Sequence, residues 1–491
     1  MNPGDWLLAA EPAQLLPARS QMAFTLAFHI ILVPIGVALP AILLIANYRG
    51  LRRSDPVALT LARRWSHALA LTFAVGAVSG TVLSFEMGML WPGLTDTYGD
   101  VFGLPFAMEG VAFFIEAILI AIYIYGWKRL KPWTHFWLGV PIPFVSLFGA
   151  FSIISANAWM NMPAGFVAGP NGEPTNIDPI AAIFNDALPY EFIHFVIGAY
   201  MAAGFTVASI YTIGWLRGRR DRYHRLGILI PFTVAAIATP LQFVAGDSTA
   251  RAVYKDQPAK FAAMEVVTQS GTDQTEIIFG RYDEATNTVA GGIRIPGLNS
   301  ILAGFSRDTN VQGLDAFALE DRPSNVNVVH WAFDTMVTIA CVLILIVLLF
   351  AFTYWRRRAV PRNRPLLWLV ACSGVLTYIA IEAGWFVTEV GRQPWVVYGH
   401  LRTSDAVTQT PAGTVRTTFT IVMILYALLA VGTVAGLRSM SRRWRRQDEA
   451  DDTSPYGPRP APEGADGATP PKPPPEPAPT GETPASSGVE P

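Results

Sequence analysis

The stretch TMVTIACVLILIVLLFAFTYW, residues 335–355, contains no Asp, Glu, Lys or Arg, and it decides the fold class. Roughly 20 apolar residues cross a bilayer as a helix, which satisfies its own backbone hydrogen bonds in lipid. Further charge-free stretches lie at residues 20–48, 66–85, 132–172 (one span plus an exit loop), 192–216, 226–246 and 417–437. Two further apolar stretches, 104–127 and 366–390, are long enough to span a membrane but contain carboxylates. We therefore expect an all-α, polytopic membrane helix bundle with about nine transmembrane helices.

The composition supports this class and excludes others. Of 491 residues, 51% are hydrophobic and 15% are charged, whereas soluble domains have about 25% charged residues. A net charge of −1 gives no electrostatic footprint for nucleic acid. Cys341 and Cys372 both lie in apolar runs, which excludes a disulfide scaffold, a thiolate metal cluster and a C-x-x-C-H haem attachment site.

Basic residues predict the orientation. They gather in 47–64, 127–135, 216–226, 356–365 and beyond 437, whereas 86–103 and 157–191 have none. Excess Lys and Arg mark the cytoplasmic side. We therefore expect the N-terminus and a long loop, about 247–327, outside, and the C-terminus in the cytoplasm. This loop contains strand-like stretches at 276–279 and 292–295.

The chain divides into two parts. Residues 1–447 form the predicted membrane-embedded part, and residues 448–491 hold 13 of the 38 prolines and nine acidic residues against two basic ones. Such a segment cannot bury enough apolar surface to fold. We expect a disordered, Pro-rich, acidic cytoplasmic tail.

Ionisable residues inside a membrane are costly, so each is a candidate functional residue. With this orientation the candidates gather in the outer half of the bundle, below the loop; they are His29, Glu109, Glu116, His194, Met336, Trp385, Glu389 and Arg392. His67 is the exception, near the cytoplasmic end of the second span. Alone, a histidine could bond a neighbouring helix, Met336 could fill the core and Trp385 could be an interfacial residue. Together, two histidines, a methionine and carboxylates suit haem ligation and proton delivery.

Residues 384–395, Gly-Trp-Phe-Val-Thr-Glu-Val-Gly-Arg-Gln-Pro-Trp, resemble the signature of subunit I of the cytochrome bd quinol oxidases. Other segments that are similar to the family follow in the same order, at 28–34, 108–116, 156–159, 192–194, 246–247 and 260–265. The resemblance covers about residues 15–440. The short loop and the motif Phe-Ala-Met-Glu-Gly-Val-Ala-Phe-Phe are similar to the branch called cyanide-insensitive oxidases.

The resemblance implies three haems. His194 and Met336 would ligate a low-spin haem b, and His29 and Glu389 would each ligate one of a high-spin pair, a haem b and a haem d. The favoured assignment gives His29 to haem d and Glu389 to haem b. Glu109 would lie beside the oxygen-reducing haem; Trp385 would lie between haems and Arg392 near their propionates.

The resemblance also implies quinol contacts at Lys260 and Glu265, with Gln257 nearby; the alternative for this segment is a solvated surface helix. Two positions depart from the family. His67 stands where many members have a lysine on the proton-entry path. Asp334 stands where many members have an arginine near the low-spin haem, which puts the potential of that haem in doubt.

We therefore expect the haem-bearing catalytic subunit of a quinol:oxygen oxidoreductase in the bacterial cytoplasmic (inner) membrane. Quinol would be oxidised at the outer face with Glu265 as a proton acceptor, and oxygen reduced to water with cytoplasmic protons passing His67, Glu116 and Glu109. Turnover would be electrogenic without a pump. The implied partners are a second integral subunit (subunit II), quinol, oxygen and the lipid bilayer, and a small single-span subunit could accompany them.

Two rival functions remain open at this point. One is a membrane ion channel or secondary transporter that uses Glu109, Glu116 and Glu389. The other is a haem-b quinone-linked electron carrier that never meets oxygen.

Overall fold

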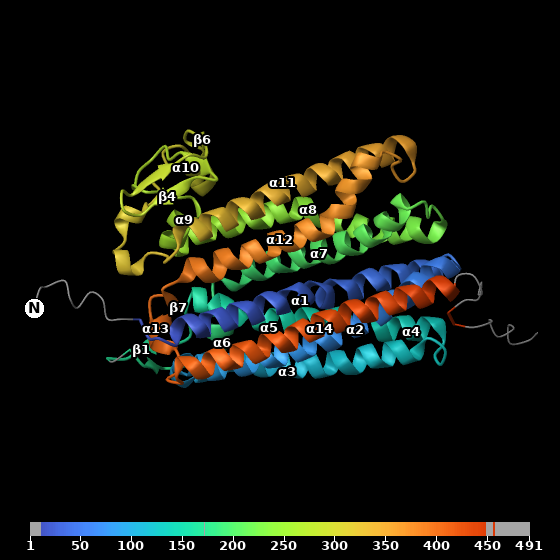
Figure 1. The fold of residues 1–491 in the computed structure, drawn as a ribbon, viewed down its shortest axis with the longest axis horizontal. Helices are drawn as coiled ribbons and strands as arrows, with labels where there is room; N and C mark the ends of the chain where they lie inside the picture. The colour runs from blue at the N-terminus through green and yellow to red at the C-terminus, as the bar shows by residue number, and fades with distance from the viewer. Residues whose placement is uncertain (1–10, 171, 448–454, 457–491) are drawn as a thin grey trace, which may run out of the picture.

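The computed structural model describes residues 11–170, 172–447 and 455–456 (Figure 1). Within them, nine helical segments are long and apolar enough to cross a membrane. They are α1 (Leu15–Arg52), α2 (Pro56–Leu90), α3 (Pro92–Gly126), α4 with α5 (Pro132–Gly139 and Pro141–Asn161), α7 (Leu188–Leu216), α8 (Arg222–Asp256), α11 (Val326–Arg357), α12 (Arg364–Arg392) and α14 (Ala412–Gln447). The predicted fold class is confirmed.

Proline and aspartate set where several helices begin. Pro141 has no backbone N–H, so the helical run that starts at Pro132 is interrupted between α4 and α5. The Asp221 carboxylate accepts a hydrogen bond from the backbone N–H of His224 (2.8 Å) and caps α8. These helices extend beyond the predicted spans: α8 continues to Asp256, so the first ten residues of the expected loop, 247–256, are helical.

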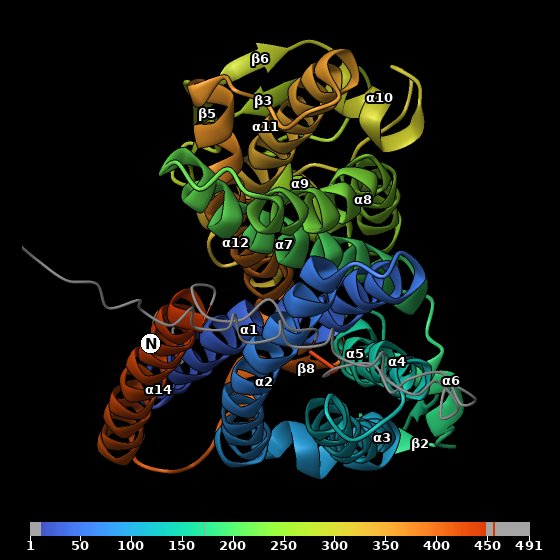
Figure 2. The same cartoon turned by 90° about the vertical axis from the view of Figure 1, so that its right-hand side faces the viewer.

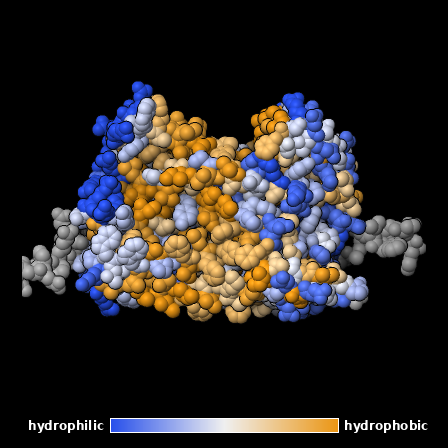
Figure 3. Space-filling model, turned by 180° about the vertical axis from the view of Figure 1, so that it is seen from behind, coloured by the Kyte–Doolittle hydropathy of each residue, from blue (hydrophilic) through white to orange (hydrophobic). Residues whose placement is uncertain are grey.

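The long helices form two neighbouring groups. Helices α7, α8, α11 and α12 pack around an apolar core that includes Phe205, Phe232 and Leu343. Helices α1, α2, α3 and α14 lie beside them with α4 and α5, and α1 packs against α7 across the boundary (Figure 2). The surface shows a broad apolar band between hydrophilic ends (Figure 3), as a bilayer-spanning protein requires.

The long loop covers one end of the group formed by α7, α8, α11 and α12. It contains the helices α9 (Pro258–Met264) and α10 (Leu298–Gly304), the 3-10 helices η1 (Leu314–Ala316) and η2 (Leu319–Asp321), and two hairpin-like sheets. Strand β3 (Glu276–Ile278) pairs antiparallel with β6 (Ile293–Ile295), and β4 (Arg281–Asp283) with β5 (Thr288–Ala290). The two strand-like stretches of the sequence are therefore strands, and they pair with each other.

Six short elements complete the same end of the bundle. They are α6 (Pro179–Ile183), α13 (Thr403–Ala406) and the strand pairs β1 with β2 (Val167–Ala168 and Pro174–Thr175) and β7 with β8 (Trp395–Val397 and Leu401–Arg402).

The prediction for the tail falls outside the described residues, apart from Pro455 and Tyr456. The Tyr456 hydroxyl donates to His135 Nδ1 (2.8 Å), and its ring packs 5.0 Å from the Trp127 ring at the end of the bundle opposite the loop.

Candidate functional site

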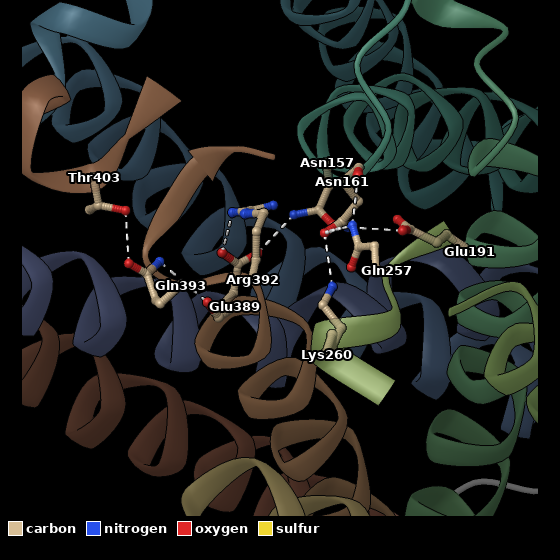
Figure 4. A network of polar contacts seen from close by, with 9 residues as sticks. All are labelled: Asn157, Asn161, Glu191, Gln257, Lys260, Glu389, Arg392, Gln393 and Thr403. Carbon is tan, nitrogen blue, oxygen red and sulfur yellow. Dashed lines mark hydrogen bonds and ion pairs between the residues drawn. The ribbon is translucent and has the colours of Figure 1, made fainter. Parts of the chain in front are cut away.

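A polar network joins α5, α7, α9 and α12 beneath the loop (Figure 4). Asn157 and Asn161 lie one turn apart on α5, so their side chains share a face. Asn157 Nδ2 donates to Glu389 Oε1 (2.8 Å), and Asn161 Nδ2 donates to Glu191 Oε1 (2.9 Å). Two amides therefore connect the proposed haem ligand Glu389 with a second carboxylate on α7.

Helix α9 adds two of the predicted quinol contacts to this network. Gln257 Nε2 donates to the backbone O of Asn161 (2.6 Å), and Lys260 Nζ donates to Asn161 Oδ1 (3.0 Å). The side chain of Lys260 is 4% exposed, so α9 is not the solvated surface helix that the sequence left open. A Cβ at Gly391 would lie only 2.9 Å from Lys260 Cγ, so a glycine of α12 admits the lysine stem.

The charge state of Lys260 is set by this buried position. Burial and the nearby Arg392 guanidinium lower the pKa of Lys260 to about 7, against the opposing effect of Glu191 and Glu389. A lysine in this range exchanges protons near neutral pH, which suits a group that binds a hydroxyl and moves its proton.

Arg392 closes the network on α12. Its Nη2 donates to Glu389 Oε2 (2.6 Å), while its Nε and Nη1 are buried and find no partner among the described residues. Unpartnered buried donors are costly, and two such donors on one guanidinium fit an anionic partner such as a haem propionate.

The proposed histidine and methionine ligands each face a glycine of another helix. Added Cβ atoms would lie 3.0 Å from His29 Cε1 at Gly80, 3.5 Å from His194 Cε1 at Gly246 and 3.1 Å from Met336 Sδ at Gly384. At Gly80 and Gly384 a Cβ would crowd the candidate ligand, whereas at Gly246 it would make an ordinary contact, so the first two glycines make room for the imidazole and the thioether.

A hydrogen bond to α2 orients the His29 ring. Ser79 Oγ donates to the backbone O of Gly76 (3.0 Å), so it accepts from His29 Nδ1 (2.9 Å). This assigns the proton to Nδ1 and leaves a lone pair on Nε2, the form that binds iron. At His194, the Gln242 amide lies 3.1 Å from Nε2 and 3.3 Å from Nδ1, which does not select one tautomer. The chemistry of these side chains and the two unpartnered donors of Arg392 fit haem.

The remaining candidates lie outside this network. Glu116 is buried on α3 and accepts from Ser146 Oγ of α5 (2.5 Å), whereas Glu109, two turns away, is half-buried. Trp385 packs on the cluster of Ile154 and Leu188, between α5 and α7.

Two predicted residues are separated from the others. His67 Nδ1 donates to the backbone O of Arg63 (2.7 Å), near the end of α2 opposite the loop. Glu265 is buried at the end of α9 and contacts Glu276 of β3, so the structure does not place it in the Asn161 network.

Sequence reasoning missed Asn157, Asn161 and Glu191. Asn157 enters the sequence comparison only as part of the similar segment 156–159. Two signals could have revealed them. The two asparagines are spaced one helical turn apart at the end of a charge-free span, and the glutamate lies one turn before His194.

A bundle of membrane-spanning helices with histidine, methionine and glutamate side chains between them defines a class, the membrane proteins that hold haem between helices. The comparisons then give the family. The model of the cytochrome bd terminal oxidase subunit I family matches residues 17–444, and the chain belongs to this family.

Relatives from Bacillus subtilis (strain 168) and Escherichia coli (strain K12) support the same family. A protein provisionally named cytochrome bd menaquinol oxidase subunit I, from B. subtilis, is 34% identical over 86% of this chain and 95% of its own length. The E. coli cytochrome bd-II ubiquinol oxidase subunit 1 is 27% identical over 87% of this chain and 96% of its own length. The structure of bd oxidase from Geobacillus thermodenitrificans has a TM-score of 0.82 and 35% identity over 88% of this chain and 98% of that chain.

The chain is thus a subunit of an oxygen-reducing quinol oxidase and a multi-pass membrane protein. This decides against the channel or transporter and against the carrier that never meets oxygen.

Proposed function

We propose that this chain is the haem-bearing catalytic subunit, and that it oxidises quinol at the face formed by residues 247–327. The observation that carries the proposal is the network that links Gln257 and Lys260 to Glu389 through α5. It couples the residues proposed to bind quinol to a residue proposed to bind haem.

Quinol oxidation requires groups that orient the hydroxyls and accept their protons. Lys260 and Gln257 present a buried amine and a buried amide from one short helix, next to the carboxylate of Glu191. An amine with a pKa of about 7 is partly neutral at physiological pH and can accept a hydrogen bond from a quinol hydroxyl. Glu265 is the proposed acceptor of the proton that leaves to the outside.

The residues present would hold three haems, in the arrangement that the family resemblance implies. His194 and Met336 would hold a low-spin haem b; His29 and Glu389 would hold a haem d and a high-spin haem b respectively, with Trp385 between haems. Arg392 would neutralise propionates with Nε and Nη1, which have no partner in the part of the chain that the structure describes. When bound, these groups carry the electrons of quinol and bind and reduce oxygen.

Protons for water formation would enter from the opposite face. His67, near that face, could load a route toward Glu116, which Ser146 holds in place, and Glu109. The basic loops lie at that end, where Arg222 Nη2 meets Asp55 Oδ2 at 2.8 Å, and Lys/Arg excess marks the cytoplasmic side. Because quinol protons leave on one side and water protons enter on the other, turnover would be electrogenic without a pump.

Helices α2, α3 and α14 are the proposed contact with the second integral subunit. In the most apolar stretch of each of these helices, only 17%, 17% and 11% of the residues are buried inside the protein, against 50% in α7. Exposed polar side chains such as Thr81 and Ser84 also lie on α2, where lipid alone would be a poor partner.

The test is a reduced-minus-oxidised optical spectrum of the purified enzyme together with oxygen consumption driven by quinol. We expect haem b and haem d bands and quinol-dependent oxygen uptake. Haem b without haem d would contradict the proposed haem set, and haem without quinol-driven uptake would contradict the site at residues 247–327.

A further inference from the structure

Two carboxyl groups meet beneath the loop. Glu265 is the C-cap residue of α9, Glu276 begins β3, and the antiparallel pairing of Glu276 with Ile295 sets the register of that strand. Their side chains are only 4% and 6% exposed and are within hydrogen-bonding distance of each other. Two carboxylates cannot accept from one another, so this contact requires a proton on one of them.

We propose that Glu276 shares one proton with Glu265 and thereby sets the pH range in which Glu265 can receive a proton from quinol. This inference rests on the proposed function of Glu265. Glu276 acts through Glu265, so it is a positioning residue.

The surroundings of the pair show which group carries the charge. Asn299 Nδ2 donates to Glu276 Oε2 (3.2 Å), which favours the ionised form of Glu276, whereas Glu265 Oε2 is buried and unpartnered among the described residues. The resting proton therefore belongs mainly to Glu265. The charged and titratable groups that face the pair from α11 are Asp334 and His330.

Electrostatics reinforces this distribution. Burial, followed by the charge and hydrogen bond of Glu276 and the charge of Asp334, raises the pKa of Glu265 well above its usual range. Burial also raises the pKa of Glu276, and the Asn299 hydrogen bond opposes that effect. His330 joins this group: Nδ1 donates to Met264 O (2.7 Å), and Nε2 accepts from Gly280 N–H (3.1 Å) and lies 3.3 Å from Asp334 Oδ2.

The proton step balances simply. A quinol O–H bond breaks, an O–H bond forms on the ionised form of Glu265, and the electrons go to oxygen in the established reaction. Glu265 becomes ionised when its shared proton moves to Glu276 or leaves to the outer side.

The decisive variant is Glu276→Gln in the complete, haem-loaded oxidase. It keeps the shape but removes the like charge, so the proton affinity of Glu265 should fall about tenfold. Two readouts should move together. The infrared C=O signal of the protonated carboxyl should titrate away about one pH unit lower, and the acid limb of kcat/KM for quinol should shift down by about the same amount.

Glu284→Gln is the matched control, because Glu284 is an exposed acid of the same loop. An unchanged infrared titration and acid limb in Glu276→Gln would overturn the proposal, as would an equal shift in Glu284→Gln. If Glu276→Gln loses haem, Glu276→Leu repeats the test without a buried polar group. A wild-type oxidase that does not oxidise quinol would instead contradict the proposed function, and the infrared titration would still test the pair.

Discussion

At the residue scale, Met336 is the most direct test of the haem assignment. Leucine has a similar volume, so Met336→Leu should cost less than about 1.5 kcal/mol in stability while removing the sulfur that faces Gly384. We expect a five-coordinate or misligated haem with a lowered potential, measured by redox titration. Met423→Leu on α14 is the control. An unchanged potential and low-spin band would remove Met336 from the ligand set.

Lys260 tests the quinol site at the same scale. A hydrogen bond to a charged group contributes about 1.5–3 kcal/mol, so Lys260→Ala should lower kcat/KM for quinol roughly 10- to 100-fold. The haem spectra should persist, and direct chemical reductants should still drive oxygen consumption. Lys255→Ala, at an exposed lysine of α8, should leave the kinetics unchanged. Normal quinol kinetics in Lys260→Ala would show that α9 has only a structural role.

Glu116 tests the proton route. Gln retains a carbonyl that can accept from Ser146, so a purely structural role would survive Glu116→Gln. An amide cannot release a proton, however, and we expect full haem content with oxygen reduction lowered about tenfold or more. Substitution of His67 should be milder, because water at the cytoplasmic mouth can replace it. Steady-state oxygen consumption with excess quinol at the parental rate would contradict the route.

Some residues of the candidate site stand in sequence motifs, whereas others reach it only through the fold, and only the first kind could be predicted. Lys260 and Glu389 stand in recognisable motifs, so sequence comparison located them. Asn161 acts through its backbone oxygen as well as its side chain, and it meets α9 only because α5 and α9 end at the same face. The contact of Glu265 with Glu276 likewise depends on the register of β3, which cannot be read from the sequence around either residue.

At the element scale, hydropathy located every span but not its ends. Helices α3 and α8 extend past their apolar stretches because their terminal turns pack on other parts of the protein. Hydropathy describes contact with lipid and therefore does not predict these turns. The sequence predicted strands in the loop, but it did not predict how the loop is attached to the helices. Asp334, expected to affect a haem, accepts from the backbone N–H of Phe279 (2.5 Å) and so holds the loop on α11.

His330 is the other attachment of the loop, and it provides a prediction at this scale. His330→Ala would leave the buried Met264 carbonyl and Gly280 N–H unsatisfied, which costs about 1–3 kcal/mol for each group. We expect faster trypsin cleavage at Arg281 and Arg294 and weaker quinol oxidation, with haem content retained. Unchanged cleavage would show that the strand pairs alone hold the loop.

At the scale of the whole molecule, the two ends of the bundle carry different chemistry. The loop, α9 and the Asn161 network lie at one end, and the basic connections, including Arg222 with Asp55, lie at the other. If the basic end is cytoplasmic, residue 284 is outside and residue 358 inside. In a background with Cys341 and Cys372 replaced by serine, Glu284→Cys should react with an impermeant maleimide on intact cells, and Arg358→Cys only after permeabilisation.

The same asymmetry predicts charge separation during turnover. In the proposed function, quinol would release its protons at the loop face, while the protons for water would reach the site from the basic face past Glu116, so no proton would need to be pumped across the bundle. In liposomes of the complete oxidase oriented with the loop outward, an oxygen pulse should acidify the outside and make it electrically positive. An uncoupler should abolish both signals, and Glu116→Gln should reduce them in proportion to its oxygen consumption. Acidification of the side that carries the basic loops would contradict both the orientation and the position of the quinol site.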